Sequence, residues 1–127
     1  FISADVAGKG IHAGMVMAKA STLFEIMSRD QVDVDEMAFH MNNDLHLTKT
    51  GGMFVTSIVG EYNLITDEIR WVNAGHQPAV LRDENGKYSQ FESSAPPLGV
   101  IKQKEKSIYI IIYYLSSFSP HLNKRQN

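Results

Sequence analysis

The sequence predicts an α+β domain in which helices pack on antiparallel strands. Apolar residues recur at helical spacing through residues 11–29 and again through residues 33–49. The period then changes, because residues 53–92 consist of short β-branched and aromatic runs separated by turn residues. A further strand-like segment, residues 1–6, precedes the helices, so the helices would lie between strands in the chain order.

Composition and charge exclude several classes of protein. The 127 residues suffice for one domain, and 43% hydrophobic with 20% charged residues is ordinary for a globular chain. A formal net charge of -2 provides no basic face for a nucleic-acid backbone, and the absence of cysteine excludes disulfides and thiolate metal sites. The longest apolar run, residues 108–115, is too short to span a bilayer as a helix. We therefore expect a cytoplasmic protein that binds neither nucleic acid nor a membrane.

Each predicted helix has one expected buried face. In the first helix this face is formed by Met15, Ala18, Thr22 and Ile26, and it is widened by Leu23 and Met27. In the second helix the buried face is formed by Val34, Met37, Ala38, Met41 and Leu45. Asp33 and Glu36 fit a capping box at the start of this second helix.

Two hairpins are predicted after the helices. The first joins residues 53–64 to residues 69–75 through a short polar turn. The second joins residues 77–83 to residues 87–92, and the Asn-Gly pair at 85–86 is a strong signal for a type I′ turn between them.

The end of the chain predicts one more strand and a tail. A strand is predicted at residues 107–115, because residues 108–115 are apolar without interruption, which is typical of a strand buried on both faces. Residues 116–127 show no period and are expected to form a disordered tail.

Asp5 ends the first predicted strand and is followed by the loop AGKG, which contains Gly8 and Lys9. Magnesium and manganese prefer carboxylate and carbonyl oxygens, and glycines let the backbone approach an ion or a phosphate closely. The loop is not a nucleotide P-loop, because the first glycine of that motif would fall on Ser3 and Gly10 stands where Ser or Thr is needed. From these residues alone, Asp5 either binds an ion or merely caps the loop or the following helix.

Among the five histidines, His76 has the most informative position. It ends the sequence NAGH, which begins at Asn73 and lies at the exit of a predicted strand. No His-x-x-x-His pair occurs, so a zinc site is not expected. His76 can line a site at this strand end, or it can equally bond the backbone and pin the turn.

Three blocks of the sequence together resemble one family. ADVAGKGIHAGMVMA is similar to the signature G-D-V-S/A-G-K-G-x-x-A-x-x-M, and APPLGV is similar to a G-x-P-L-G-V loop. Between them, MFVTSIVGEYNLITDEIRWVNAGHQPAVL resembles a block with F-V-T and N-A-G-H-x-P. All three are features of the SpoIIE-like (RsbU-type) branch of the metal-dependent (PPM-type) protein serine/threonine phosphatases. They occur in the family order and cover residues 1 to about 101.

This resemblance implies a layered fold of antiparallel sheets flanked by helices, with two Mn²⁺ or Mg²⁺ ions at one edge. Asp5 would bridge the ions as the catalytic residue, and the backbone carbonyl of Val6 would complete one coordination shell. Gly8, Lys9, Asn73 and His76 would line the site. A metal-activated water would hydrolyse phosphoserine or phosphothreonine on a regulatory protein, such as an anti-sigma-factor antagonist. The parent protein would carry an N-terminal sensor or receiver domain.

The sequence also departs from the family pattern. The family has one acid upstream and others in an S/T-D-G-x-x-E segment after the last strand, where this chain reads SSFSP. We therefore expect residues 1–115 to be a partial phosphatase domain, truncated at both ends, and residues 116–127 to be a non-matching tail. Asp5 supplies one negative charge against the four positive charges of two divalent ions, so metal binding and activity should be weak. Missing strands would leave a sheet edge unpaired, which favours self-association.

Two other functions remain open from the sequence. A catalytically dead phosphatase-like domain could bind a phosphoprotein or a partner domain without turnover, and the absent downstream acids favour this alternative. A nucleotide-binding module built on AGKG is a remote alternative, because the Walker spacing is missing.

Overall fold

The computed structural model describes residues 1–48, 51–104 and 111–114. The elements along the chain are β1 (Ile2–Val6), α1 (Gly10–Arg29), α2 (Val34–Leu47), β2 (Val55–Asn63), β3 (Glu68–Ala74), β4 (Ala79–Arg82), β5 (Tyr88–Phe91) and β6 (Ile111–Tyr114). This order confirms the predicted succession of a strand, two helices and a run of strands.

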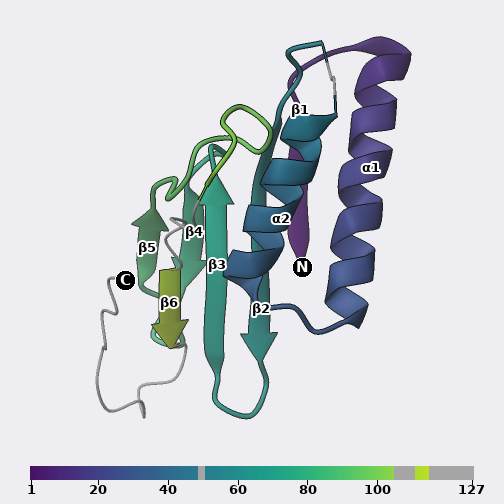
Figure 1. The fold of residues 1–127 in the computed structure, drawn as a ribbon. Coiled ribbons are helices and arrows are strands. Elements are labelled where there is room, and N and C mark those ends of the chain that lie inside the picture. Colours follow the sequence, from purple (N-terminus) through teal and green to yellow (C-terminus); the bar gives the residue numbers. More distant parts are fainter. Residues whose placement is uncertain (49–50, 105–110, 115–127) are drawn as a thin grey trace.

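The strands form two antiparallel sheets. The larger sheet has the order β1-β2-β3-β6, and β4 pairs with β5 in a separate sheet of two strands. Figure 1 shows α1 and α2 together on one face of the larger sheet. Val72 of β3 belongs to the core under these helices, whereas the neighbouring Trp71 contacts Phe91 of β5. Because successive residues of a strand point to opposite faces, β4 and β5 lie on the face opposite the helices.

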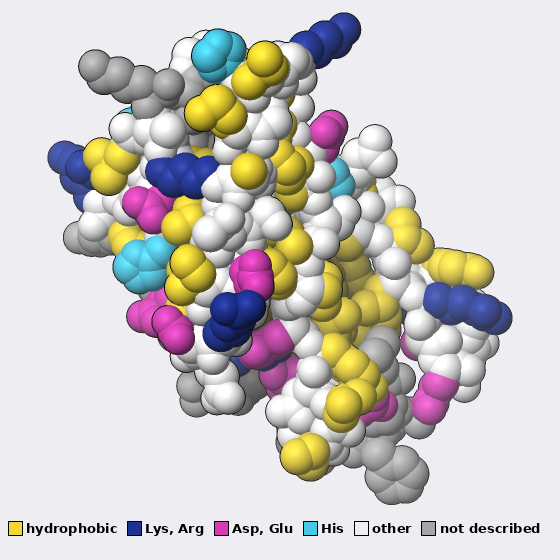
Figure 2. Space-filling view, turned by 90° about the vertical axis from the view of Figure 1, so that its right-hand side faces the viewer, with side chains coloured by type: hydrophobic (Ala, Val, Ile, Leu, Met, Phe, Trp, Pro, Cys, Tyr) yellow, Lys and Arg dark blue, Asp and Glu magenta, His cyan; other side chains and the backbone are white. Residues whose placement is uncertain are grey.

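The molecule is therefore layered, which confirms the predicted α+β class. The second sheet covers only part of the larger one. Figure 2, viewed from the α1 side, shows hydrophobic side chains gathered in a hollow between the main body and a smaller lobe.

The core between the helices and the larger sheet depends mainly on α2. Its buried residues include the whole predicted face, Val34, Met37, Ala38, Met41 and Leu45. They pack against Val55, Val59, Val72 and Ala74 of the sheet and against Leu98. The periodicity of this helix therefore predicted its packing correctly.

The predicted buried face of α1 is wrong for its central residues, which are all exposed: Met15, Ala18, Thr22 and Ile26. It is confirmed for Leu23 and Met27, which were expected to widen that face. Val16 and Ala20 are buried, and Leu23, Phe24 and Met27 are partly buried against the core. Met15 is 64% exposed and Ile26 is 51% exposed. Two stripes of α1 carry apolar residues at helical spacing, and the stripe that contains Val16 and Ala20 faces the core.

The start of α2 also differs from the prediction. Asp33 occupies the N-cap position, but its side chain makes no capping hydrogen bond, so the expected capping box is not formed. The first intrahelical hydrogen bond is present, because the Met37 N–H donates to the Asp33 carbonyl at 2.8 Å.

The hairpin of β4 and β5 forms as expected, but its turn is of another type. A type I′ turn requires positive φ at both central residues, whereas of the pair Asn85 and Gly86 only Gly86 has positive φ, at 81°. The Asp83 carboxylate organises the loop, because its Oδ1 accepts the N–H groups of Asn85 at 2.9 Å and Lys87 at 2.8 Å. This side chain favours a three-residue loop over the tighter turn that the Asn-Gly pair predicts.

The last described strand, β6, pairs with β3 at one end of the larger sheet. Residues 111–113 are half-buried, so the expected burial on both faces is not observed for this part of the strand. The rest of the strand predicted at 107–115, like the predicted tail at 116–127, lies outside the described residues. Within the described chain, β1 and β6 each pair on one side only.

A turn at the end of β3 is fixed by Asn73 and Gly75. The fully buried Asn73 accepts the His76 N–H at Oδ1 and donates from Nδ2 to the Gln77 carbonyl, each at 2.9 Å. Gly75 has φ of 66°, and a Cβ at this position would lie 2.4 Å from Cγ of Pro97. The residue at 75 must therefore be glycine for both conformational and steric reasons.

The first prediction compares two methionines. Met41→Ala should lower the free energy of unfolding by about 2–5 kcal/mol, because it empties a fully buried position of α2. Met15→Ala should change it by less than about 0.5 kcal/mol, because Met15 is on the exposed side of α1. Urea unfolding followed by circular dichroism measures both. Equal losses in the two variants would contradict the observed packing of α1.

The second prediction compares two glycines with positive φ. Gly75→Ala and Gly86→Ala should each lose about 1 kcal/mol from backbone strain. Gly75→Ala should lose at least about 1 kcal/mol more, because its Cβ meets the ring of Pro97 whereas that of Gly86 meets only the flexible end of Arg82. The same urea measurement applies, and equal stabilities would show that Pro97 does not constrain the turn.

Candidate functional site

Asp5 lies one residue before the end of β1, and its side chain is exposed. Ile2, Ala4 and Val6 pack against the core under the helices. Because side chains alternate along a strand, Asp5 projects from the opposite face of the sheet. Its cross-strand partner in β2 is Thr56, whose side chain therefore lies on the same face.

Thr56 connects Asp5 to His76. The hydroxyl Oγ1 of Thr56 lies 2.9 Å from Nδ1 of His76, and it also donates to the carbonyl of Asp5 at 3.4 Å. A parallel bridge between Ser57 and Gly75 places the turn after β3 beside β2. Residues from separate blocks of the sequence thus meet around one hydroxyl group.

The backbone carbonyl of Val6 is open to a ligand. Ala7 donates to the Phe54 carbonyl and Gly60 to the Phe1 carbonyl, each at 2.9 Å, so the odd-numbered residues of β1 exchange hydrogen bonds with β2. Val6 lies between two such residues, and its carbonyl points to the other side of β1. No strand of the described chain pairs there.

The loop after β1 leaves little side-chain bulk beside this carbonyl. Gly8 and Lys9 are both exposed, and Lys9 takes the N-cap position of α1 without a capping hydrogen bond from its side chain. A Cβ on Gly8 would lie 2.9 Å from Sδ of Met53, so a larger residue would displace that side chain. Both predicted loop residues therefore lie next to Asp5 along the chain and remain accessible.

Asn73 contributes to the site indirectly, because its side chain binds the backbone of the turn that carries His76. Both atoms of its side-chain amide are used within the turn, and the side chain is fully buried. It therefore places His76 rather than contacting a ligand. For His76 itself, the side chain points to Thr56 while its backbone N–H is held by Asn73.

The structure thus brings together one carboxylate, one open carbonyl and one imidazole. No group of three or more acidic, histidine or cysteine side chains that could hold a metal ion occurs in residues 1–48, 51–104 and 111–114. A single carboxylate with carbonyl oxygens offers weak ligation to a hard divalent ion. Thr56 is the residue that sequence reasoning missed, although it stands in the quoted F-V-T block, next to the buried Val55.

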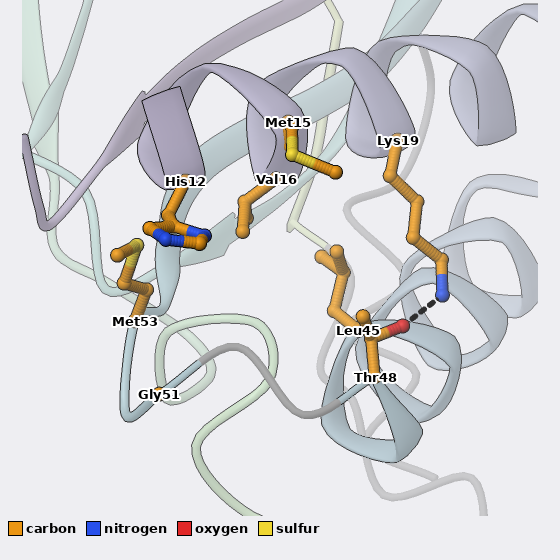
Figure 3. A pocket seen from close by; sticks show the side chains of 8 residues that line it. All are labelled: His12, Met15, Val16, Lys19, Leu45, Thr48, Gly51 and Met53. Carbon is orange, nitrogen blue, oxygen red and sulfur yellow. Dashed lines mark hydrogen bonds between the residues drawn. The ribbon is translucent and has the colours of Figure 1, made fainter. Parts of the chain in front are cut away.

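A separate pocket lies between the two helices (Figure 3). Its volume is about 440 Å³, and it is lined by His12, Met15, Val16, Lys19, Leu45, Thr48, Gly51 and Met53. Lys19 reaches across it from α1, and its Nζ donates to the Thr48 hydroxyl and, at 3.0 Å, to the Asp44 carbonyl. The lining contains no carboxylate, so this pocket does not resemble a site for a divalent cation.

Comparison with curated proteins finds two relatives from Bacillus subtilis (strain 168). Phosphoserine phosphatase RsbP is 25% identical over 105 residues, which is 80% of this chain and 26% of RsbP. Phosphoserine phosphatase RsbU is 22% identical over 122 residues, which is 95% of this chain and 34% of RsbU. The chain therefore spans between a quarter and about a third of the length of these relatives.

Solved structures with the same fold are found as well. The RsbU and RsbW domains of a Mycobacterium tuberculosis protein match 91% of this chain and 31% of that chain, with a TM-score of 0.76 and 22% identity. RsbX in complex with magnesium matches 91% of this chain and 53% of that chain, with a TM-score of 0.73 and 16% identity. At these identities the comparison shows the fold alone, and it confirms the predicted phosphatase-like layering.

The family comparison covers most of the sequence. The family model described as Stage II sporulation protein E (SpoIIE) matches residues 1–111. That range includes the Asp5 loop, the NAGH turn and the PPLGV segment, which carried the resemblance seen in the sequence. The chain belongs to the SpoIIE family.

Proposed function

We propose that this chain forms part of a metal-dependent protein serine/threonine phosphatase domain, which hydrolyses phosphoserine or phosphothreonine on a regulatory protein. The observation that carries the proposal is the meeting of Asp5 and His76 at Thr56, beside the open carbonyl of Val6. Membership of the SpoIIE family supports it, as do two relatives named phosphoserine phosphatases.

In this proposal, Asp5 and the carbonyl of Val6 hold Mn²⁺ or Mg²⁺. Both groups offer oxygen ligands, which these ions prefer, and one structural neighbour, RsbX, was solved in complex with magnesium. By resemblance to the family, a complete domain would hold two ions, which would supply a nucleophilic water and offset charge on the phosphoryl group. The exposed Asp5 carboxylate and the uncluttered loop at Gly8 give a phosphorylated side chain access to this edge.

Charge limits what the chain can do by itself. Two divalent ions bring four positive charges, whereas Asp5 brings one negative charge, and the described residues supply no cluster of further acids. Lys9 adds a positive charge to the same loop, which suits a phosphate but not a metal ion. We therefore infer weak metal binding and weak or no turnover for this chain alone.

The substrate and the regulatory parts are proposed from the family. A phosphorylated regulator, such as an anti-sigma-factor antagonist, would be the substrate, and a sensor or receiver domain would precede this domain in the parent protein. The relatives are three to four times as long as the matched segment, which leaves room for such domains. The described part of the chain contains no helix that is long and apolar enough to cross a membrane, and a cytoplasmic location stays a prediction.

A second candidate function is a regulator that binds a phosphoprotein without hydrolysing it. The small number of acids near Asp5 in the described residues favours this binding function. The chain has the family fold and the His76 turn, but few groups that could bind a metal ion. The two candidates differ in turnover by the complete domain, and both allow weak metal binding at Asp5 in this chain. Rapid phosphate release that depends on Asp5 would exclude the binding function.

The third prediction concerns metal binding. Manganese titrated into the purified chain in a calorimeter should bind weakly, with a dissociation constant near 1 mM, or about -4 kcal/mol. Asp5→Asn should remove the binding heat, because the amide keeps the shape but loses the charge. Asp30→Asn, which changes an exposed acid after α1, should leave it unchanged. Tight binding that survives Asp5→Asn would overturn the assignment of Asp5.

The fourth prediction concerns turnover. With manganese present, the chain should release phosphate from a phosphoserine protein no faster than Asp5→Asn does, because one carboxylate cannot hold a two-ion centre. Phosphate release is measured over time against a buffer blank. Rapid release that Asp5→Asn abolishes would contradict weak activity and would exclude the purely binding function.

A further inference from the structure

Thr56 makes two hydrogen-bonding contacts that join the proposed site, but the proposed function gives the Thr56 side chain itself no role. Its Oγ1 lies 2.9 Å from Nδ1 of His76 and 3.4 Å from the carbonyl oxygen of Asp5. Both contacts join parts of the site that come from distant segments of the chain. We propose that Thr56 is a positioning residue, whose hydroxyl fixes the ring orientation and the tautomer of His76 against the end of β1.

The Thr56 hydroxyl has a single hydrogen, and this determines which group donates in each of the two contacts. A hydroxyl has one hydrogen to donate and can also accept. The contact with the Asp5 carbonyl requires this hydrogen, because a carbonyl oxygen only accepts. Both contacts are therefore served when Nδ1–H of His76 donates to Thr56 Oγ1 and Thr56 donates to Asp5. In its neutral form, His76 then carries its proton on Nδ1 and a lone pair on Nε2.

The backbone around His76 is held independently of this ring contact. Asn73 binds the His76 N–H, and the Ser57–Gly75 bridge keeps the turn beside β2. Ring orientation is a separate degree of freedom, since rotation about the side-chain bonds could move the imidazole without moving the turn. The Thr56 hydroxyl is the group that restricts it, because within the described chain Nε2 of His76 has no hydrogen-bonding partner.

This arrangement gives His76 a defined role if the proposed phosphatase site is correct, and to that extent the role rests on the proposed function. The lone pair of Nε2 can accept a hydrogen bond from a water molecule beside a phosphoryl group. When the ring is protonated, the same Nε2 can donate to a phosphoryl oxygen while Nδ1–H stays bonded to Thr56.

The test uses nitrogen NMR of the ¹⁵N-labelled chain above about pH 8, where an ordinary histidine is neutral. His76→Gln identifies the His76 signals among the five histidines. Thr56→Val removes the hydroxyl but keeps a β-branched residue that suits a strand, and Thr56→Ser keeps the hydroxyl. Backbone amide spectra of both variants show whether the fold is retained.

We expect Nδ1 of His76 to appear as the protonated nitrogen in the native chain and in Thr56→Ser. In Thr56→Val we expect loss of this signature, with averaging between the two tautomers. A native chain with the proton on Nε2, or a Thr56→Val spectrum identical to the native one, would overturn the inference. Manganese calorimetry separates the two proposals, because a Thr56-dependent tautomer without metal binding would retain this inference and remove the proposed function.

Discussion

The backbone pairing of Leu98 with Val55 is the constraint on which the candidate site depends. Leu98 N–H donates to the Val55 carbonyl at 2.7 Å, and Val55 N–H returns the bond at 3.0 Å. The Leu98 side chain is buried in the core under the helices. The pairing also positions Pro97, which directly precedes Leu98 in the sequence. The Pro97 ring lies so close to Gly75 that a Cβ on residue 75 would not fit. The turn that holds His76 is therefore built on the core rather than on the exposed loop alone.

The segment that contains Leu98, residues 97–101, also connects the site to α2. Asn42, which is buried, accepts the Gly99 N–H at 3.0 Å and donates to the Ile101 carbonyl at 2.8 Å. His46 contacts the Gly99 carbonyl at 3.1 Å through Nδ1. A buried amide that loses one partner costs about 1–3 kcal/mol, so α2 and this segment are held to one relative position. Packing of the helix and geometry of the His76 turn are in this way parts of one structure.

The sequence predicted elements wherever one pattern was clearly stronger than its competitors. In α2 the apolar residues lie on a single stripe, and all of its predicted face is buried. In α1 two stripes compete, and the choice is made by contacts with α2 and β1 that a single helix does not encode, so Met15 is exposed. The prediction of a type I′ turn at Asn85-Gly86 was wrong for a related reason. The Asp83 carboxylate accepts two backbone N–H groups, and these hydrogen bonds outweigh the turn preference of the Asn-Gly pair.

Individual site residues could be predicted from the sequence, but their positions relative to one another depend on the register between β1 and β2. Asp5, Val6 and His76 follow from quoted motifs, whereas Thr56 acquires its role only because it is the cross-strand partner of Asp5. A shift of one residue between β1 and β2 would exchange the two faces of the strand and would also pair the carbonyl of Val6. The burial of Ile2, Ala4 and Val6 on the core side opposes that shift. Hydrophobic burial on one face of β1 thereby determines both the exposure of the carboxylate and the availability of the carbonyl.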